Sequence, residues 1–323
     1  IGEKTFGKDH PRVAIGCNNL SNLLRLQGKY AAAEPLVRRA IEIQDKTFGK
    51  DHPGLALLYS TLGVLLQTQG KHADAEAFYR QAIEIFENKY THDHPDAALG
   101  YNNLASLLDD QGKYAEAEPL YRRAIEIGEK ALETRHPKLA TWYNNLATSL
   151  VHRGKSADAE PLIRRSLEFG EQTLGKYHPD VARSCSNLAM VLKGQGKYGE
   201  AETLIRRALD ILERTFGKDH PNVATCCTNL GGLLQSQGEY AEAEPLHRRA
   251  IEIGEKSLGN NHPDVATRYN NLAGLFHDQG KYAEAEPLYR QAIEIGDRTL
   301  GKDHPVVATW HNNLAKMLQQ RGK

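Results

Sequence analysis

The apolar residues of this chain recur at the three- and four-residue spacing that places them on one face of an α-helix. Between Pro95 and His136, for example, Leu104, Leu107 and Leu108 lie on one such face. After Gly112 the pattern resumes over a second stretch, at Tyr114, Ala117, Leu120, Tyr121, Ala124, Ile125 and Ile127. The pattern therefore predicts two helices, which we call helix A and helix B, joined by a short turn.

This pattern repeats with a period of 42 residues. The dipeptide His-Pro marks it at residues 10–11, 52–53, 94–95, 136–137, 178–179, 220–221, 262–263 and 304–305, with no insertion or deletion. A fixed period of this size is typical of stacked modules, because neither helix can bury its apolar face alone. We therefore expect an all-α solenoid of antiparallel helical hairpins over residues 1–323. The repeats are predicted at about 11–52, 53–94, 95–136, 137–178, 179–220, 221–262 and 263–304, between the tail of a preceding helix B at 1–9 and a lone helix A at 305–323.

Start and stop signals bound the predicted helices. His94-Pro95 begins helix A, because proline suits the first helical position and the polar residue before it can cap the helix. Gly112 is expected to end helix A in a left-handed conformation. Most repeats end at a glycine before the next His-Pro, but Thr91 and Glu133 occupy this position in two of them, so those two turns should differ.

Within each repeat, the spacing of small and apolar residues resembles the tetratricopeptide repeat (TPR). The matching residues are Tyr101-x2-Leu104-Ala105-x2-Leu108, then Gly112, then Ala117-x3-Tyr121-x2-Ala124. Eight additional residues lengthen helix B and its exit. This long unit, with NNLAxLLxxQGKYxEAEPLYRRAIEI and GKDHPxVA, is similar to the repeats of the kinesin light chain and of its bacterial relatives. The resemblance implies a right-handed TPR superhelix that serves as a protein–protein interaction module.

The resemblance also implies where a ligand would bind. In TPR arrays helix A lines the concave face, and the residue just before the helix A leucine points into the groove. Seven of the eight predicted A helices carry asparagine there, and the other carries Thr61; the seven are Asn19, Asn103, Asn145, Asn187, Asn229, Asn271 and Asn313. A carboxamide has both donors and an acceptor, so it can pair with the C=O and the N–H of an extended peptide. We call these seven residues the asparagine ladder and expect them to bind a peptide or protein segment of unknown identity.

A second interpretation of the ladder is structural. Asparagine is a poor helix former, so each could instead bond the neighbouring repeat and hold the superhelix together. Seven hydrogen bonds at about 0.5–1.5 kcal/mol each contribute roughly 4–10 kcal/mol, and micromolar binding needs about 8 kcal/mol. Specificity must therefore come from other groove positions, which are acidic near residues 109–110 and basic near 183–193.

Composition and charge narrow the remaining function classes. Lys plus Arg equals Asp plus Glu, at 41 each, so no net field attracts nucleic acid or a membrane surface. No phosphate-binding loop, nucleophile elbow or HExxH motif is present, and we expect no enzyme and no cofactor. No signal peptide or membrane-spanning segment is apparent, and we expect a cytoplasmic protein. The four cysteines, Cys17, Cys185, Cys226 and Cys227, are interpreted as packing residues.

The histidines of the His-Pro steps are too far apart to share a metal ion, so we expect them to cap helices or pack in loops. Two further functions stay open beside peptide binding. The lone last helix A presents Leu314 and Leu318 without a helix B to cover them, which is compatible with a scaffold that self-associates end to end. The array is also compatible with the sensor or regulatory arm of a larger signalling protein.

Overall fold

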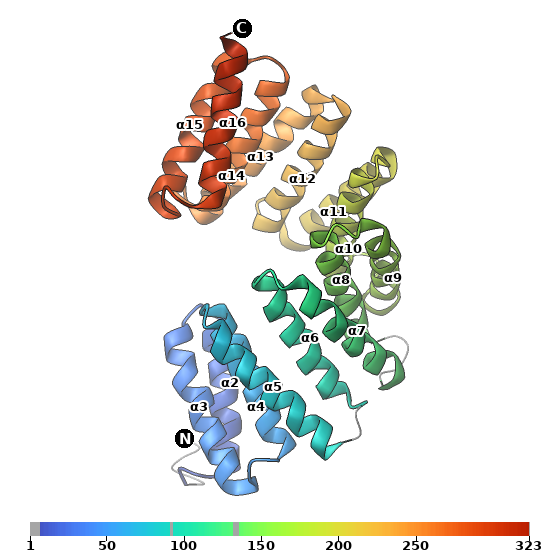
Figure 1. The fold of residues 1–323 in the computed structure, drawn as a ribbon, viewed down its shortest axis with the longest axis vertical. Coiled ribbons are helices and arrows are strands. Elements are labelled where there is room, and N and C mark those ends of the chain that lie inside the picture. The colour runs from blue at the N-terminus through green and yellow to red at the C-terminus, as the bar shows by residue number, and fades with distance from the viewer. Residues whose placement is uncertain (1–6, 91–92, 132–135, 323) are drawn as a thin grey trace. The chain divides into compact units, whose positions relative to one another are not determined.

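The structure, a computed structural model, describes residues 7–90, 93–131 and 136–322 (Figure 1). Over these residues it contains fifteen helices, α2 to α16, and no strand, which confirms the predicted all-α class. The A helices are α2 (Pro11–Leu26), α4 (Pro53–Thr68), α6 (Pro95–Asp110), α8 (Pro137–His152), α10 (Pro179–Gly194), α12 (Pro221–Gln237), α14 (Pro263–Asp278) and α16 (Pro305–Arg321). The B helices are α3 (Tyr30–Phe48), α5 (His72–Lys89), α7 (Tyr114–Ala131), α9 (Ser156–Leu174), α11 (Tyr198–Phe216), α13 (Tyr240–Leu258) and α15 (Tyr282–Thr299).

Every A helix begins in the same way. Proline occupies its first position, and the preceding histidine is the N-cap. The histidine Nδ1 accepts the backbone N–H of the residue two positions later, at 3.0–3.3 Å in all eight A helices. This bond satisfies one of the N–H groups that the first helical turn leaves without a partner, and it confirms the capping role expected for His-Pro.

The ends of the helices follow the glycine signals. Gly112 lies in the left-handed region at φ 73°, and Gly28, Gly70, Gly154, Gly196, Gly238 and Gly280 repeat this conformation after six of the other A helices. Gly322, after α16, has a right-handed φ of −81° instead. The two turns expected to differ, at Thr91 and Glu133, lie outside the described residues. Residues 1–6 of the expected helix B tail also lie outside them, and residues 8 and 9 form a turn ahead of α2.

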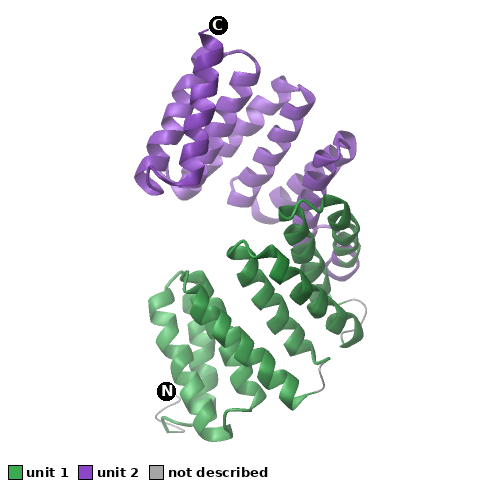
Figure 2. Ribbon diagram, in the orientation of Figure 1, with its two compact units in different colours: residues 1–169 green, residues 170–323 purple. Residues whose placement is uncertain are grey.

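The chain divides into two compact units, residues 1–169 and 170–323, with the boundary inside α9 (Figure 2). In both units consecutive helices pack against each other, and A helices of adjacent repeats also touch, as α4 does with α6 and α12 with α14. The core consists of the predicted apolar positions. Leu62, Leu104, Leu230 and Leu272, the helix A leucines of four repeats, are each at most 2% exposed.

Glycines in helix B make room for large residues of the next helix A. A Cβ built on Gly128 would lie 2.5 Å from Trp142, and one built on Gly296 would lie 2.6 Å from Trp310. Both tryptophans are buried, at 1% and 2% exposure. At these two places neighbouring hairpins therefore pack closely, because a glycine of helix B lies against a tryptophan of the next helix A.

Candidate functional site

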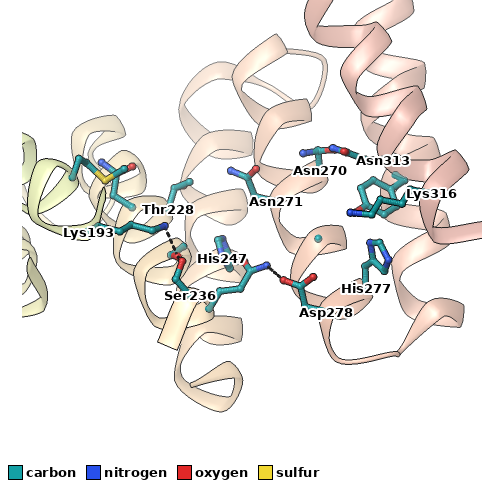
Figure 3. Close-up of a pocket in the computed structure, with 16 residues that line it drawn as sticks. Lys193, Thr228, Ser236, His247, Asn270, Asn271, His277, Asp278, Asn313 and Lys316 are labelled. Atoms are coloured by element: carbon teal, nitrogen blue, oxygen red, sulfur yellow. Dashed lines mark hydrogen bonds between the residues drawn. The ribbon is translucent and has the colours of Figure 1, made fainter. Parts of the chain in front are cut away.

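The candidate site is a hollow of about 500 Å³ in unit 2, on the side of the hairpins that the A helices form (Figure 3). Helices α10, α12, α14 and α16 supply most of its lining, and α13 and α15 add His247 and Tyr289. A second hollow of about 320 Å³ lies along α10 and α12. Both hollows follow from the repeat, because residues one helical turn apart occupy equivalent positions in every A helix and lie on the same side of it.

The structure brings the unit 2 members of the asparagine ladder to these hollows. Asn229, Asn271 and Asn313 line the larger one, and Asn187 and Asn229 line the smaller one. All four side chains are partly buried. In unit 1, Asn103 and Asn145 are partly buried in the same helix position, and Asn19 is exposed on α2.

Part of the ladder also bonds the neighbouring repeat. Asn145 Nδ2 donates to Asn102 Oδ1 at 3.0 Å, and Asn313 Nδ2 donates to Asn270 Oδ1 at 3.1 Å. The accepting asparagine comes from the position just before the ladder residue of the preceding repeat. A carboxamide that donates one N–H in this way keeps its second N–H and its oxygen for another partner. The structural and ligand-binding interpretations of the ladder are therefore compatible in the same residue.

A second row of bonds joins the A helices near their C-termini. Gln67 Nε2 donates to Asp110 Oδ2 at 2.7 Å in unit 1, and Gln235 Nε2 donates to Asp278 Oδ2 at 2.6 Å in unit 2. These amide–carboxylate contacts fix the acidic side chains at one edge of the hollow face. They also occupy oxygens that a ligand would otherwise use.

Two glycines deepen the larger hollow. Gly232 and Gly274 occupy one helix position in successive repeats, where Asn22, Val64, Ser106 and Thr148 stand in unit 1. The nearest atoms to a Cβ built on Gly232 and Gly274 are Lys193 Nζ and the Tyr289 hydroxyl, each 3.7 Å away, which is an ordinary contact distance. A ligand side chain can approach the backbone of α12 and α14 there.

His247 lies beneath this opening, where Tyr79, Tyr121 and Tyr289 stand in other repeats. Tyr79 and Tyr121 donate their hydroxyls to Gln67 and Asp109, whereas His247 Nε2 is buried without a hydrogen-bond partner among the described residues. Burial, and secondarily the charge of Lys193, lowers the pKa of His247 to about 4. The imidazole at the base of the hollow is therefore neutral at pH 7.

The charged groups differ between the two units. In unit 1, Asp109 is half-buried and accepts from Ser149 (2.8 Å) and Tyr121 (3.2 Å), and burial raises the pKa of its carboxyl. In unit 2, Lys193 stands in the same helix position, and burial lowers the pKa of its ammonium. Of the charged groove positions expected from the sequence, Asp109 and Lys193 are thus partly buried, whereas Asp110 and Arg183 are exposed.

The sequence pattern did not single out several residues that line the larger hollow. Gly232, Gly274, His247, Gln235 and Tyr289 were not among the predicted groove positions, although each can be located by its repeat position. For Gly232, Gly274 and His247 the signal that could have found them is departure from the repeat, because glycine replaces larger residues and histidine replaces tyrosine.

No group of three His, Cys, Asp or Glu side chains among the described residues could hold a metal ion. Cys185, Cys226 and Cys227 are buried thiols, and Cys17 is a partly buried one. Each described helix is too short or too polar to span a lipid bilayer.

Comparison with known proteins agrees with this architecture. Two family models, both described as tetratricopeptide repeat, match the chain: one at residues 15–88, 96–172, 138–213, 180–256, 225–297 and 264–323, the other at 60–131. No curated protein matches the sequence.

Several solved structures are similar. BtubC (BKLC) from P. vanneervenii is 25% identical with a TM-score of 0.61, covering 71% of this chain and 92% of that one. A kinesin light chain protein of Podosopora anserina with nearly identical TPR-like repeats is 24% identical, with a TM-score of 0.55, covering 64% of this chain and 98% of that one. The STAND signal transduction ATPase PH0952 from Pyrococcus horikoshii, which has a tetratricopeptide repeat sensor, is 14% identical with a TM-score of 0.70. The match covers 94% of this chain and 44% of that one.

The likenesses below 25% identity show the fold alone. The family matches cover most of the chain and coincide with the hairpins of the structure. Tetratricopeptide repeats generally mediate protein–protein interactions, and proteins built from them are generally scaffolds without catalysis. The chain belongs to the tetratricopeptide repeat family and resembles its kinesin light chain-like and bacterial members.

Proposed function

We propose that this protein binds an extended segment of a partner protein along the face formed by its A helices, with the asparagine ladder pairing to the backbone of that segment. The observation that carries the proposal is the convergence of Asn229, Asn271 and Asn313 on one hollow in unit 2. Carboxamides at regular spacing can pair with alternate backbone groups of an extended chain whatever its side chains are.

The geometry of the ladder supports backbone recognition. Asn229 and Asn271 form no hydrogen bond with another described side chain, so both amides are available in full. Asn313 donates one N–H to Asn270, and its side-chain oxygen remains available to accept a hydrogen bond from a ligand. These three residues and Asn187 would contribute roughly 2–6 kcal/mol at about 0.5–1.5 kcal/mol for each bond. Micromolar affinity needs about 8 kcal/mol, so side-chain contacts in the hollows must add to the ladder.

The test is selection of random, C-terminally amidated decapeptides on the immobilised protein, followed by affinity measurements. The variant replaces Asn229, Asn271 and Asn313 together with alanine, and Asn260→Ala, in an exposed turn, is the control. We expect the triple variant to lose binding at least tenfold while its thermal unfolding changes little. Equal affinity of the triple variant and the wild type would refute a role for the ladder, as would failure to select any peptide.

Because Asn313 also bonds Asn270, loss of stability in the triple variant would be ambiguous by itself. Asn270→Ala separates the two roles, since it removes the inter-repeat bond and leaves the ladder residue in place. We expect Asn270→Ala to lower stability by about 1 kcal/mol. Because Asn270 also lines the hollow, its effect on peptide binding should be smaller than that of the triple variant, not absent.

A further inference from the structure

The residue just before each His-Pro step contacts cations of the helix B that follows. Asp9 accepts from Arg39 Nη2 at 2.8 Å. Asp93 lies 3.3 Å from Arg123 Nη2 and 3.7 Å from Lys130 Nζ, which is two helical turns further along the same helix. Aspartate occupies this turn position at Asp9, Asp51, Asp93, Asp219 and Asp303. In the two repeats with printed ion pairs, the carboxylate therefore joins the turn between repeats to the next helix B.

Tyr177 replaces this carboxylate in the turn before α10, within unit 2. Arg207 and Arg214 of α11 occupy the same two helix positions as the cations that contact Asp93 in unit 1. The guanidinium carbon of Arg214 lies 5.2 Å from the centroid of the Tyr177 ring. The two cations of α11 are thus retained, although the turn residue that faces them carries no charge at pH 7.

The charges around the tyrosine do not balance. Arg207 pairs with Glu171 at 2.5 Å, and Arg214 donates from Nε to Asp210 at 2.8 Å. Asp210 chiefly, and the tyrosine in addition, raise the pKa of the Arg214 guanidinium. A hollow of about 300 Å³ lies among Glu171, Lys176, Tyr177, Arg207 and Asp210. Because Lys176 adds a third cation to these two ion pairs, the surroundings of the ring carry one excess positive charge.

Tyr177 is also the most accessible of the fourteen tyrosines. Its exposure is 62%, and the next most exposed, Tyr90, reaches 40%. The Tyr90 ring stacks on His94 with the centroids 4.1 Å apart. Tyr177 lies in a turn instead, so an enzyme that acts on its hydroxyl can reach it without opening the fold.

We propose that Tyr177 is a site of tyrosine phosphorylation and that Arg207 and Arg214 bind the phosphate. The phosphoryl donor is a nucleoside triphosphate held by a separate kinase. The phenol oxygen forms a bond to the terminal phosphorus, the bond from that phosphorus to the bridging oxygen breaks, the nucleoside diphosphate leaves, and the phenol proton is released.

The phosphate ester restores negative charge to this turn. It carries roughly −1.5 to −2 charges at pH 7 and three acceptor oxygens. Guanidinium groups pair with phosphate through two parallel hydrogen bonds, which are stronger than bonds between neutral groups. The phosphorylated tyrosine would therefore join the turn to α11, as Asp93 joins its own turn to α7. This inference does not depend on peptide binding by the A helices.

The first experiment tests whether the site is modified. The whole folded chain is incubated with ATP, Mg²⁺ and the catalytic domain of a broad-specificity tyrosine kinase, and mass spectrometry locates and times each phosphate. We expect Tyr177 to react about tenfold faster than Tyr90, because Tyr90 must first leave its stacking partner. Tyr177→Phe should remove the fast reaction. Modification of another tyrosine first, or none at Tyr177, would overturn the proposal.

The second experiment tests whether the arginines hold the phosphate, by ³¹P NMR titration of the phosphorylated chain. Neighbouring cations favour the dianion, so we expect the second pKa of the phosphate to lie below its ordinary value of about 6. Arg214→Gln should return that pKa toward the ordinary value. Lys256→Gln is the matched control, since it makes the same charge change in the same helix position of the next repeat, and it should have no effect.

Two outcomes of the titration contradict the proposal even if the kinase modifies Tyr177. One is an ordinary phosphate pKa in the wild type. The other is a lowered pKa that persists when Arg207 and Arg214 are both replaced by glutamine. Thermal unfolding of each variant shows whether the fold is intact. Neither outcome bears on the asparagine ladder, whose own binding test is separate.

Discussion

At the residue scale, His247 is expected to make the stability of the protein depend on pH. Burial lowers the pKa of its imidazole from an ordinary value of 6.5 to about 4. The unfolded chain therefore takes up a proton at higher pH than the folded chain does. The stability that His247 contributes is present above pH 6.5, falls as the pH drops from 6.5 to 4, and is lost below 4. The total is about 3 kcal/mol, from about 1.4 kcal/mol for each pKa unit.

The comparison variant is His247→Tyr, since tyrosine stands in this position in three other repeats and does not titrate between pH 4 and 7. Urea unfolding at pH 7.0 and 4.5 measures the difference for each protein. We expect the wild type to lose about 2–3 kcal/mol more than His247→Tyr between these two values. Equal losses would mean that His247 is protonated without cost and is not buried as described.

Gly128 and Gly232 offer a matched pair of glycine substitutions within helices. In Gly128→Ala the new methyl would lie 2.5 Å from Trp142 and 2.8 Å from Leu139, so the interface between α7 and α8 must shift. We expect a loss of about 1–3 kcal/mol in the free energy of unfolding. In Gly232→Ala the nearest atom is 3.7 Å away, and the gain in helix propensity should stabilise by up to about 1 kcal/mol. Thermal unfolding of both variants tests the opposite signs, and a stabilising Gly128→Ala would contradict the tight fit against Trp142.

At the element scale, the histidine caps are expected to act one helix at a time. His220 Nδ1 accepts the N–H of Asn222 at 3.2 Å at the start of α12. His220→Ala leaves that N–H without its acceptor and should cost about 1 kcal/mol, whereas His220→Asn should retain most of the stability because asparagine is a strong N-cap. Hydrogen exchange of the first turn of α12 provides the local readout. Unchanged protection in His220→Ala would show that water replaces the cap at no cost.

The elements were the part of the fold that the sequence predicted best. His-Pro and Gly112 signalled the start and end of helix A, because proline and left-handed glycine impose local backbone geometry. The bonds between hairpins were not predictable in the same way. The pairing of Asn145 with Asn102 depends on the rotation of one hairpin against the next, which no local pattern contains. The hollow over Gly232 is a similar case, because it requires small residues to coincide in adjacent repeats.

At the scale of the whole molecule, a solenoid should lose stability locally, since each repeat contacts only its neighbours. Leu272→Ala removes a side chain that is 2% exposed between hairpins of unit 2 and should cost about 2–5 kcal/mol. We expect hydrogen exchange to speed up across α12 to α16 and to stay unchanged in α4 and α6 of unit 1, because local unfolding needs only the neighbouring interfaces to open. Leu57→Ala, at a leucine that is 46% exposed, is the control and should change stability by less than about 0.5 kcal/mol. If Leu272→Ala accelerated exchange equally in α4 and α6, the chain would unfold as one cooperative body and nearest-neighbour stability would be wrong for it.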